Sequence, residues 1–282
     1  MWTTEFETTS RYFFNVSIRY LTENGDENSM KLQRKDEIIK LISENRIVKA
    51  NELSEYFQVS METIRRDLVQ LEEEGFVRRT HGGAVLNIAG GVEPDFSHRE
   101  ISNFEEKLLI GKRTAELVEE GDTIIIDIGT TTLEFARFLK GKNITVITNS
   151  LKIAYELMDS ESVKVIMVGG VVRKGEGTTS GYWAEDMIEQ FWVDKLFLGV
   201  GCVDMAQGIM DFHIEETNLR RHYLKHAKQV IALADYSKFG WKALNKVCSM
   251  KNIDVLVTDE NTDKKYIKEL RDKDIEVIVA GY

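Results

Sequence analysis

The feature of this sequence that most constrains its fold is a series of seven short apolar runs in the carboxy-terminal two-thirds of the chain. The runs are rich in β-branched residues, and segments of helix length separate them: TIIID, ITVIT, VKVIMVGG, KLFLGVG, QVIALAD, DVLVTD and EVIVA. Strands buried in a parallel sheet are typically continuous apolar runs, each joined to the next by a crossover helix. The pattern predicts an α/β fold with a mostly parallel sheet, whose ligands bind beyond the carboxyl ends of the strands.

The composition is that of a folded protein with room for two domains. The chain has 282 residues, 43% hydrophobic and 30% charged, which excludes disordered and fibrous proteins. The domains that we predict are an extension at 1–29, disordered or ahead of the native start, a small domain at 30–86, a linker at 87–102 and the α/β domain at 103–282. The only proline, Pro94, lies in that linker.

The small domain contains a helix-turn-helix pattern. One helix is predicted at about 51–57, and a second begins after Ser60, a residue that can cap it. Ile64, Leu68 and Leu71 form the apolar stripe of the second helix, so its other residues face outward. In this motif the first turn of the second helix faces base edges in the major groove of DNA.

A wing and a set of DNA contacts follow from this geometry. The segment FVRRTHGGAV predicts two short strands around a glycine turn, with arginines suited to phosphate or minor-groove contacts. Arginine can bond guanine in a bidentate manner, and threonine can contact a thymine methyl group. The candidate DNA-binding residues are Ser60, Met61, Glu62, Thr63, Arg65, Arg66, Arg78, Arg79 and His81. The alternative is that Arg65 and Arg66 pair with Asp67 or Glu62 on a solvated helix.

A candidate anion pocket lies in the segment IIIDIGTTTLEFA. A strand ends at Asp127, a glycine follows, and three threonines begin a helix, so N–H groups, hydroxyls and the helix dipole converge there. Threonines that only cap the helix are the alternative. Three further strand ends contribute polar or glycine residues to the same edge of the sheet. The candidate pocket residues are Asp127, Gly129, Thr130, Thr131, Thr132, Asn149, Ser150, Gly169, Gly170 and Lys238.

The sequence also resembles a known family. The segment VSMETIRRDLVQLEEEGFVRRTHGGAV is similar to the amino-terminal signature of DeoR family transcriptional regulators. EKLLIGKRTAELVEEGDTIIIDIGTTT, ITNS, VGG and DYSKFG resemble that family's effector-binding domain, so the likeness covers roughly residues 30–282. The resemblance implies a repressor of a sugar-metabolism operon, released from operator DNA by a phosphorylated sugar. We expect a protein without a cofactor or enzymatic activity, and a cytoplasmic one, because the sequence starts without a basic segment followed by an apolar stretch. Because operators are bound by symmetric pairs of modules, a homodimer or homotetramer is expected.

The α/β part also resembles ribose-5-phosphate isomerases, which have a glycine/Ser/Thr loop, a strand-end acid motif and a D-x-S-K segment. Where those enzymes have D-G-A-D-E-x-D, this chain has GVGCVD, so Asp204 alone remains. The resemblance implies an isomerase-like fold that lacks the catalytic acids. Asp204 and Glu216 are interpreted as acceptors for sugar hydroxyls, with Arg220 one helical turn after Glu216; the alternative is a surface ion pair between Glu216 and Arg220.

Three alternatives from other classes stay open. The chain could be a sugar-phosphate isomerase or, because D-x-G-T-T resembles the phosphate loop of sugar kinases, a kinase, although it is short for two ATPase halves. The helix-turn-helix could also bind only a protein partner.

Cys202 and Cys248 form no CxxC or Cys/His cluster, so we expect neither a metal site nor a disulfide. No apolar run reaches the about 18 residues that span a bilayer, so no membrane partner is expected.

Overall fold

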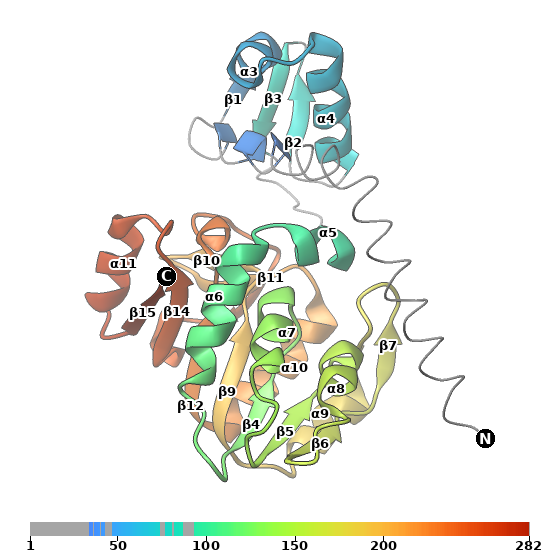
Figure 1. Cartoon of the computed structure of the whole chain (residues 1–282), viewed down its shortest axis with the longest axis vertical. Helices are drawn as coiled ribbons and strands as arrows, with labels where there is room; N and C mark the ends of the chain where they lie inside the picture. Colours follow the sequence, from blue (N-terminus) through green and yellow to red (C-terminus); the bar gives the residue numbers. More distant parts are fainter. Residues whose placement is uncertain are drawn as a thin grey trace, which may run out of the picture. The chain divides into compact units, whose positions relative to one another are not determined.

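The chain divides into two compact units, with the boundary between residues 86 and 87 (Figure 1). The computed structural model describes residues 34–35, 37–39, 41–42, 47–73, 77–80, 82–86 and 93–281. The extension predicted at 1–29 lies outside the described residues.

The amino-terminal unit combines helices with a small antiparallel sheet. Its described elements are β1 (Ile47–Lys49), α3 (Ala50–Phe57), α4 (Met61–Glu73), β2 (Val77–Thr80) and β3 (Gly83–Leu86). The strands are ordered β1-β3-β2, so β2 and β3 form the predicted hairpin and β1 pairs with its outer edge. β1 is only three residues long, and no apolar run in the sequence indicated it.

The predicted stripe on α4 forms the core of this unit. Ile64, Leu68 and Leu71 are buried together with apolar residues of α3 and the sheet. The Ser60 hydroxyl accepts a hydrogen bond from the Thr63 backbone N–H at 3.1 Å, which is the predicted N-cap of α4. The break between α3 and α4 and the orientation of α4 are therefore as the sequence predicts.

Within residues 93–281, the second unit contains a seven-stranded sheet. Its order is β15-β14-β12-β9-β4-β5-β6, and every neighbouring pair is parallel. The strands are β4 (Thr123–Ile126), β5 (Ile144–Thr148), β6 (Val163–Met167), β9 (Val193–Gly199), β12 (Ala227–Leu233), β14 (Val255–Asp259) and β15 (Glu276–Ala280). Each of the seven apolar runs forms one of these strands, so the predicted α/β fold with a parallel sheet is confirmed.

Helices cover both faces of this sheet, and each face has its own apolar core. Along β4, Ile124 and Ile126 pack into one core and Ile125 into the other, as the alternation of a strand requires. The helices on the first face are α6 (Phe104–Ala115), α7 (Thr130–Arg137) and α8 (Leu151–Leu157). Those on the second face are α9 (Tyr182–Ile188), α10 (Ile214–His226) and α11 (Lys264–Arg271).

Smaller elements lie in the connections between the strands of this sheet. A two-stranded ribbon consists of β7 (Val171–Arg173) and β8 (Thr178–Ser180). A three-stranded antiparallel sheet contains β10 (Cys202–Asp204), β11 (Gly208–Asp211) and β13 (Asn245–Cys248), and the short 3-10 helices are η1 (Tyr236–Lys238) and η2 (Met250–Asn252). The sequence did not indicate these elements, because three or four residues of mixed polarity form no recognisable run.

The segment that we expected to be a linker differs from that expectation in its second half. Residues Phe96–Ile101 form helix α5, and the Phe96 side chain is buried in the core beneath α6 and α7. Arg99 pairs with Glu93 at 3.2 Å and with Glu176 on the β7–β8 ribbon. These contacts make the chain from Glu93 onward part of the α/β unit, and residues 87–92 lie outside the described residues.

Candidate functional site

The outward face of α4 presents the candidate DNA contacts. Met61, Glu62, Arg65 and Arg66 are exposed and Thr63 is half-buried. Among the described residues, Arg65 has no ion-pair partner. Arg66 Nε lies 3.3 Å from Glu62 Oε1, but the two side chains are 76% and 62% exposed, and such surface pairs contribute little stability.

Asp67 is not a partner of either arginine on this surface. Its side chain is 1% exposed and accepts a hydrogen bond from Arg34 Nε at 2.6 Å, inside the unit. Of the alternative pairings for Arg65 and Arg66, only the Arg66–Glu62 pair is present among the described residues. On this face, therefore, Arg66 has an ion-pair partner among the described residues and Arg65 has none.

The wing arginine Arg79 is held by the helix. Its backbone N–H and its Nε donate to the two carboxylate oxygens of Glu72, at 2.8 and 2.5 Å. These bonds are the main reason that the pKa of Glu72 is lowered. Arg79 thus links strand β2 to α4 through these hydrogen bonds, although its side chain is exposed to solvent. The side chain of Arg78, and His81 as a whole, lie outside the described residues.

The strand order reverses between β4 and β9. The chain passes outward through β4, β5 and β6 and then returns to β9 on the other side of β4. Such a reversal is the point at which open α/β sheets bind ligands, beyond the carboxyl ends of the strands. Gly199 ends β9, and a Cβ there would lie 2.1 Å from the Ile128 carbonyl oxygen, so the two loops approach too closely for a side chain.

A buried ion-pair triad lies at this reversal. Arg220 Nε donates to Asp127 Oδ2 at 2.6 Å, and Arg220 Nη1 lies 2.7 Å from Asp211 Oδ2. Arg220 is 4% exposed and the two carboxylates are exposed by 3% or less. Burial raises the pKa of Asp127 to about 6, although Arg220 opposes the shift. Asp127 also accepts a bond from the Gly199 N–H at 3.1 Å, so it joins β4, β9 and α10.

Glu216 is not the surface residue of the alternative interpretation. Its side chain is 2% exposed, and it does not pair with Arg220. Instead, Glu216 Oε2 accepts from Arg173 Nη1 and Oε1 accepts from Thr178 Oγ1, both at 2.8 Å. The alternative interpretation, a surface ion pair between Glu216 and Arg220, is therefore wrong. Arg220 instead pairs with two buried aspartates, Asp127 and Asp211.

The threonine loop begins α7 as predicted. Gly129 has a φ of 153° and precedes the helix, and Thr132 Oγ1 donates to the Gly129 carbonyl at 3.0 Å. The first backbone N–H groups of a helix have no intrahelical partner. Within the described residues, the hydroxyls of Thr130 and Thr131 also make no hydrogen bond. Thr132 thus bonds back to the residue before the helix, and no side chain caps the N–H groups of the first turn in this described segment.

The β7–β8 ribbon packs against the residues that follow β5 and β6. Asn149 Nδ2 donates to the Thr179 carbonyl at 2.9 Å, and Ser150 caps α8. Gly170 has a φ of 141°, and a Cβ there would lie 2.5 Å from the Ser180 carbonyl oxygen, so only glycine fits. The TTS run of β8 therefore joins Asn149, Gly170 and Glu216. Its cluster of hydroxyl residues was the signal in the sequence that could have indicated it.

Three other predicted residues, Asp204, Lys238 and Gly169, make no hydrogen bond or ion pair with the threonine loop in the described part of the chain. Asp204 Oδ1 accepts from the N–H groups of Ala206 and Gln207 at 3.0 and 2.7 Å, so it stabilises its own turn. Lys238 has no ion-pair partner among the described residues. Although burial would raise the pKa of Asp235, Lys238 and other groups lower it. Gly169 has open space around its Cα.

Buried polar atoms without partners mark the same region. In the part of the chain that the structure describes, Asn149 Oδ1, Tyr223 Oη and Asp235 Oδ2 make no hydrogen bond. Burial, and next the Asp127 carboxylate, raise the pKa of Tyr223, so its hydroxyl lies near the triad. Buried polar atoms almost always have a partner, so these atoms indicate a place for a ligand or ordered water.

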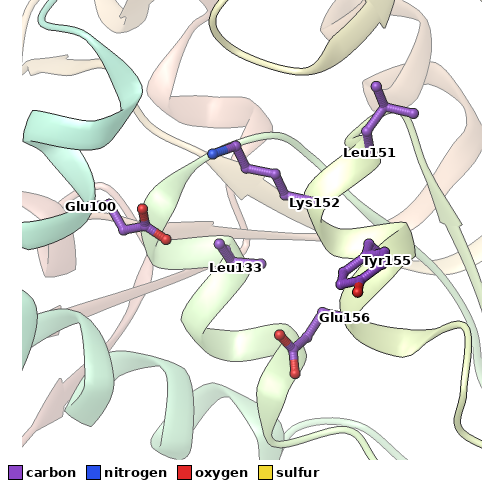
Figure 2. Close-up of a pocket in the computed structure, with 6 residues that line it drawn as sticks. All are labelled: Glu100, Leu133, Leu151, Lys152, Tyr155 and Glu156. Atoms are coloured by element: carbon purple, nitrogen blue, oxygen red, sulfur yellow. The ribbon is translucent and has the colours of Figure 1, made fainter. Parts of the chain in front are cut away.

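A separate shallow depression of about 420 Å³ lies between α5, α7 and α8 (Figure 2). Its lining residues are Glu100, Leu133, Leu151, Lys152, Tyr155 and Glu156, and none of them is a predicted site residue. The Lys152 ammonium lies 3.7 Å from the centroid of the Phe96 ring, a cation–π contact. The depression lies between helices and is open to solvent.

The described residues offer no obvious metal or redox chemistry. No group of three His, Cys, Asp or Glu side chains among them is placed to hold a metal ion. Cys202 and Cys248 are free and buried, and burial raises the pKa of each thiol to about 12. A thiol with so high a pKa is a poor nucleophile. No described helix is both long enough and apolar enough to cross a bilayer.

A winged helix-turn-helix followed by an α/β unit whose strand order reverses at its centre is the architecture of a DNA-binding regulator that senses a small molecule. Comparison with known families agrees with this class. The DeoR-like helix-turn-helix domain matches residues 34–89, and the DeoR C terminal sensor domain matches residues 102–260, more than half of the chain. The chain belongs to the DeoR family of transcriptional regulators, and the predicted family is confirmed.

Curated relatives agree with this assignment over nearly their whole length. The HTH-type transcriptional regulator GolR of Listeria innocua is 37% identical over 249 residues, which cover 88% of this chain and 98% of that protein. The glycerol-3-phosphate regulon repressor of Escherichia coli (strain K12) is 34% identical over 246 residues, 87% and 97% of the two chains.

A ribose 5-phosphate isomerase from Methanocaldococcus jannaschii aligns with 49% of this chain and 55% of its own, at 19% identity and a TM-score of 0.37. The fold assignment rests on the order of the sheet rather than on that alignment.

Proposed function

We propose that this regulator represses a sugar-metabolism operon and that a phosphorylated sugar, bound at the strand ends of the α/β unit, releases it from operator DNA. The observation that supports the ligand most directly is the set of unpartnered polar groups around the strand-end reversal. The family membership and the names of the relatives support the DNA-binding role.

The DNA-binding half of the proposal rests on the first turns of α4. Arg65 is exposed and has no ion-pair partner among the described residues, so it can bond a guanine edge. Arg66 gives up only a weak surface pair with Glu62 when it contacts a phosphate. Because each module binds one half-site, the proposed active form is a dimer or a tetramer of the chain.

The effector half rests on the threonine loop. Its free N–H groups and the hydroxyls of Thr130 and Thr131 lie at the amino terminus of α7, where the helix dipole favours an anion. Residues 84–282 contain 25 basic and 32 acidic residues, a net charge of −7 that opposes a phosphate dianion. Lys238, a cation without an ion-pair partner among the described residues, supplies the local countercharge in this proposal.

The sugar itself would contact the groups beyond that loop. Glu216 and the unpartnered Asn149 Oδ1 are acceptors for hydroxyl groups. The triad of Asp127, Arg220 and Asp211 orients α10 against β4 and β9, so we assign it to support of the pocket rather than to direct contact. Asp204 is bound to its own turn, which disfavours the catalytic alternative of an isomerase with paired acids.

Two variants in the pocket test this proposal. Thr131→Val and Lys238→Ala should bind operator DNA as the parent does but should not be released by the inducing sugar phosphate. Thr131→Ser keeps the hydroxyl and Lys251→Ala removes an exposed lysine elsewhere on the α/β unit, so both controls should respond normally. Fluorescence anisotropy on an operator selected from random DNA measures release. If Thr131→Val and Lys238→Ala respond like the parent, the pocket lies elsewhere.

A further inference from the structure

Five charged side chains form a continuous line from the proposed effector pocket to the segment that follows the DNA-binding unit in the sequence. Arg173 joins Glu216 and Glu93, with its Nη1 and Nη2 each 2.8 Å from a carboxylate oxygen. Arg99 Nη2 then lies 3.2 Å from the second oxygen of Glu93 and also contacts Glu176. The charges alternate along the line, and each arginine is shared by two carboxylates.

Arg173 occupies the central position between pocket and segment. It lies on the β7–β8 ribbon, whereas Glu216 lies on α10 and Glu93 precedes α5. Its side chain is 20% exposed, and those of Glu93 and Glu216 are 10% and 2% exposed, so water screens these pairs only weakly. Burial alone would lower the pKa of Arg173, but the two carboxylates raise it, so the guanidinium stays charged.

The guanidinium fork suits this position because it presents separate N–H groups to two acceptors at once. A lysine would offer one compact ammonium and could not hold both carboxylates in the same geometry. The pocket end of the line is also hydrogen-bonded, since Thr178 occupies the other oxygen of Glu216. A ligand hydroxyl that bonds Glu216 must compete with Thr178 and Arg173 for those two oxygens.

We propose that Arg173 is a positioning residue that transmits occupancy of the effector pocket to the segment Glu93–Ile101. The inference rests on the proposed function, in which Glu216 contacts the effector. When a ligand takes over Glu216, Arg173 loses the carboxylate that positions its side chain, and its pair with Glu93 weakens. Only residues 87–92 separate β3 of the DNA-binding unit from Glu93, so a change at Glu93 acts on a short connection.

The first experiment needs no ligand. Hydrogen–deuterium exchange is measured on the full chain with Glu216→Gln, which weakens the pocket end of the line without touching Glu93. We expect peptides that cover 93–101 to exchange about tenfold faster than in the parent. The matched control is Glu116→Gln, which removes an exposed Glu–Arg pair of the same unit and should leave those peptides unchanged. Unchanged exchange in Glu216→Gln would overturn the inference.

The second experiment measures coupling with glucose 6-phosphate, fructose 6-phosphate, ribose 5-phosphate and glycerol 3-phosphate as probes. Glu93→Gln should bind the probe that releases the parent with unchanged affinity, while the factor by which that probe weakens DNA binding falls about tenfold. Full coupling in Glu93→Gln would contradict the role of the line. If no probe releases the parent, the proposed function is contradicted, and the exchange result then decides only whether Glu216 and the segment Glu93–Ile101 are coupled through Arg173.

Discussion

Replacement of Arg220 by methionine is the sharpest test of how the buried triad holds the strand-end reversal together. The side chain of Arg220 is 4% exposed and contacts two buried carboxylates, Asp127 at 2.6 Å and Asp211 at 2.7 Å. Methionine fills similar space but leaves both carboxylates without their cation. Removal of one partner from a buried ion pair destabilises proteins by about 3–5 kcal/mol, so Arg220→Met should unfold the α/β unit at lower denaturant concentration.

The loss should depend on pH in a defined direction. Burial raises the pKa of Asp127 to about 6 in the folded chain, above its usual value of 3.8, and Arg220 is the main group that opposes this shift. Without Arg220 the folded pKa rises further, so the folded variant binds a proton over a wider range than the unfolded chain. At low pH, the proton on Asp127 favours the folded state. This contribution to the free energy of unfolding is lost as the pH rises through the pKa that Asp127 has in the folded chain. The difference between variant and parent should therefore be larger at pH 8 than at pH 5.5.

Urea denaturation followed by tryptophan fluorescence measures this, because Trp183, Trp192 and Trp241 all lie in the α/β unit. The free energy of unfolding is compared between parent and Arg220→Met at both pH values. The control is Arg113→Met, which removes an exposed arginine that pairs with Glu116 and should change stability little. A loss below about 1 kcal/mol, or an equal loss at both pH values, would refute the buried triad as described.

Two further predictions concern single residues. Arg65→Ala should weaken binding to the selected operator by about 1–3 kcal/mol and relax the preference for its sequence. Arg66→Ala should weaken binding to all DNA sequences alike and lower the slope of log affinity against log salt concentration by about 1. If the two variants behave equally in salt titrations, the base contact is misassigned. Gly199→Ala would place a Cβ 2.1 Å from the Ile128 carbonyl oxygen, so it should lower stability by about 1–3 kcal/mol in the same urea assay, and an unchanged midpoint would show that the two loops can separate freely.

The central fold could be predicted from the sequence because its strands are buried on both faces. Runs such as TIIID and DVLVTD do not alternate apolar with polar residues, as strands with one solvent-exposed face do. Each of these runs forms a strand of the parallel sheet. The β7–β8 ribbon is different. Its strands contain arginine, threonine and serine, and contacts to Asn149 and Glu216, far away in sequence, hold it in place. No local pattern contains that information.

The same distinction applies to the candidate site. The cap at Ser60 and the Arg66–Glu62 pair follow helix spacing, so a sequence pattern could indicate both. Arg220 was predicted beside Glu216 by the same spacing, yet it pairs with Asp127, 93 residues away. Once a helix is buried, tertiary partners decide where a charged side chain goes, because an unpaired buried charge is far less stable than a weak surface pair.

The expected linker illustrates a further reason. A proline and a glycine-rich stretch indicated a flexible connection, but Phe96 gives the following helix an apolar anchor and Arg99 gives it an ion pair. One buried aromatic side chain contributes enough stability to fix a six-residue helix that has no sustained apolar period. Short elements of this kind depend on a few contacts rather than on a pattern.

The most direct test of the account is the reciprocity between DNA and effector on the full chain. The dissociation constant for the selected operator is measured by anisotropy with and without a sugar phosphate, and that of the sugar phosphate with and without operator. We expect one phosphorylated sugar to weaken operator binding about fivefold or more, and operator to weaken binding of that sugar by the same factor. An operator affinity that no sugar phosphate changes, or two factors that differ, would contradict the account.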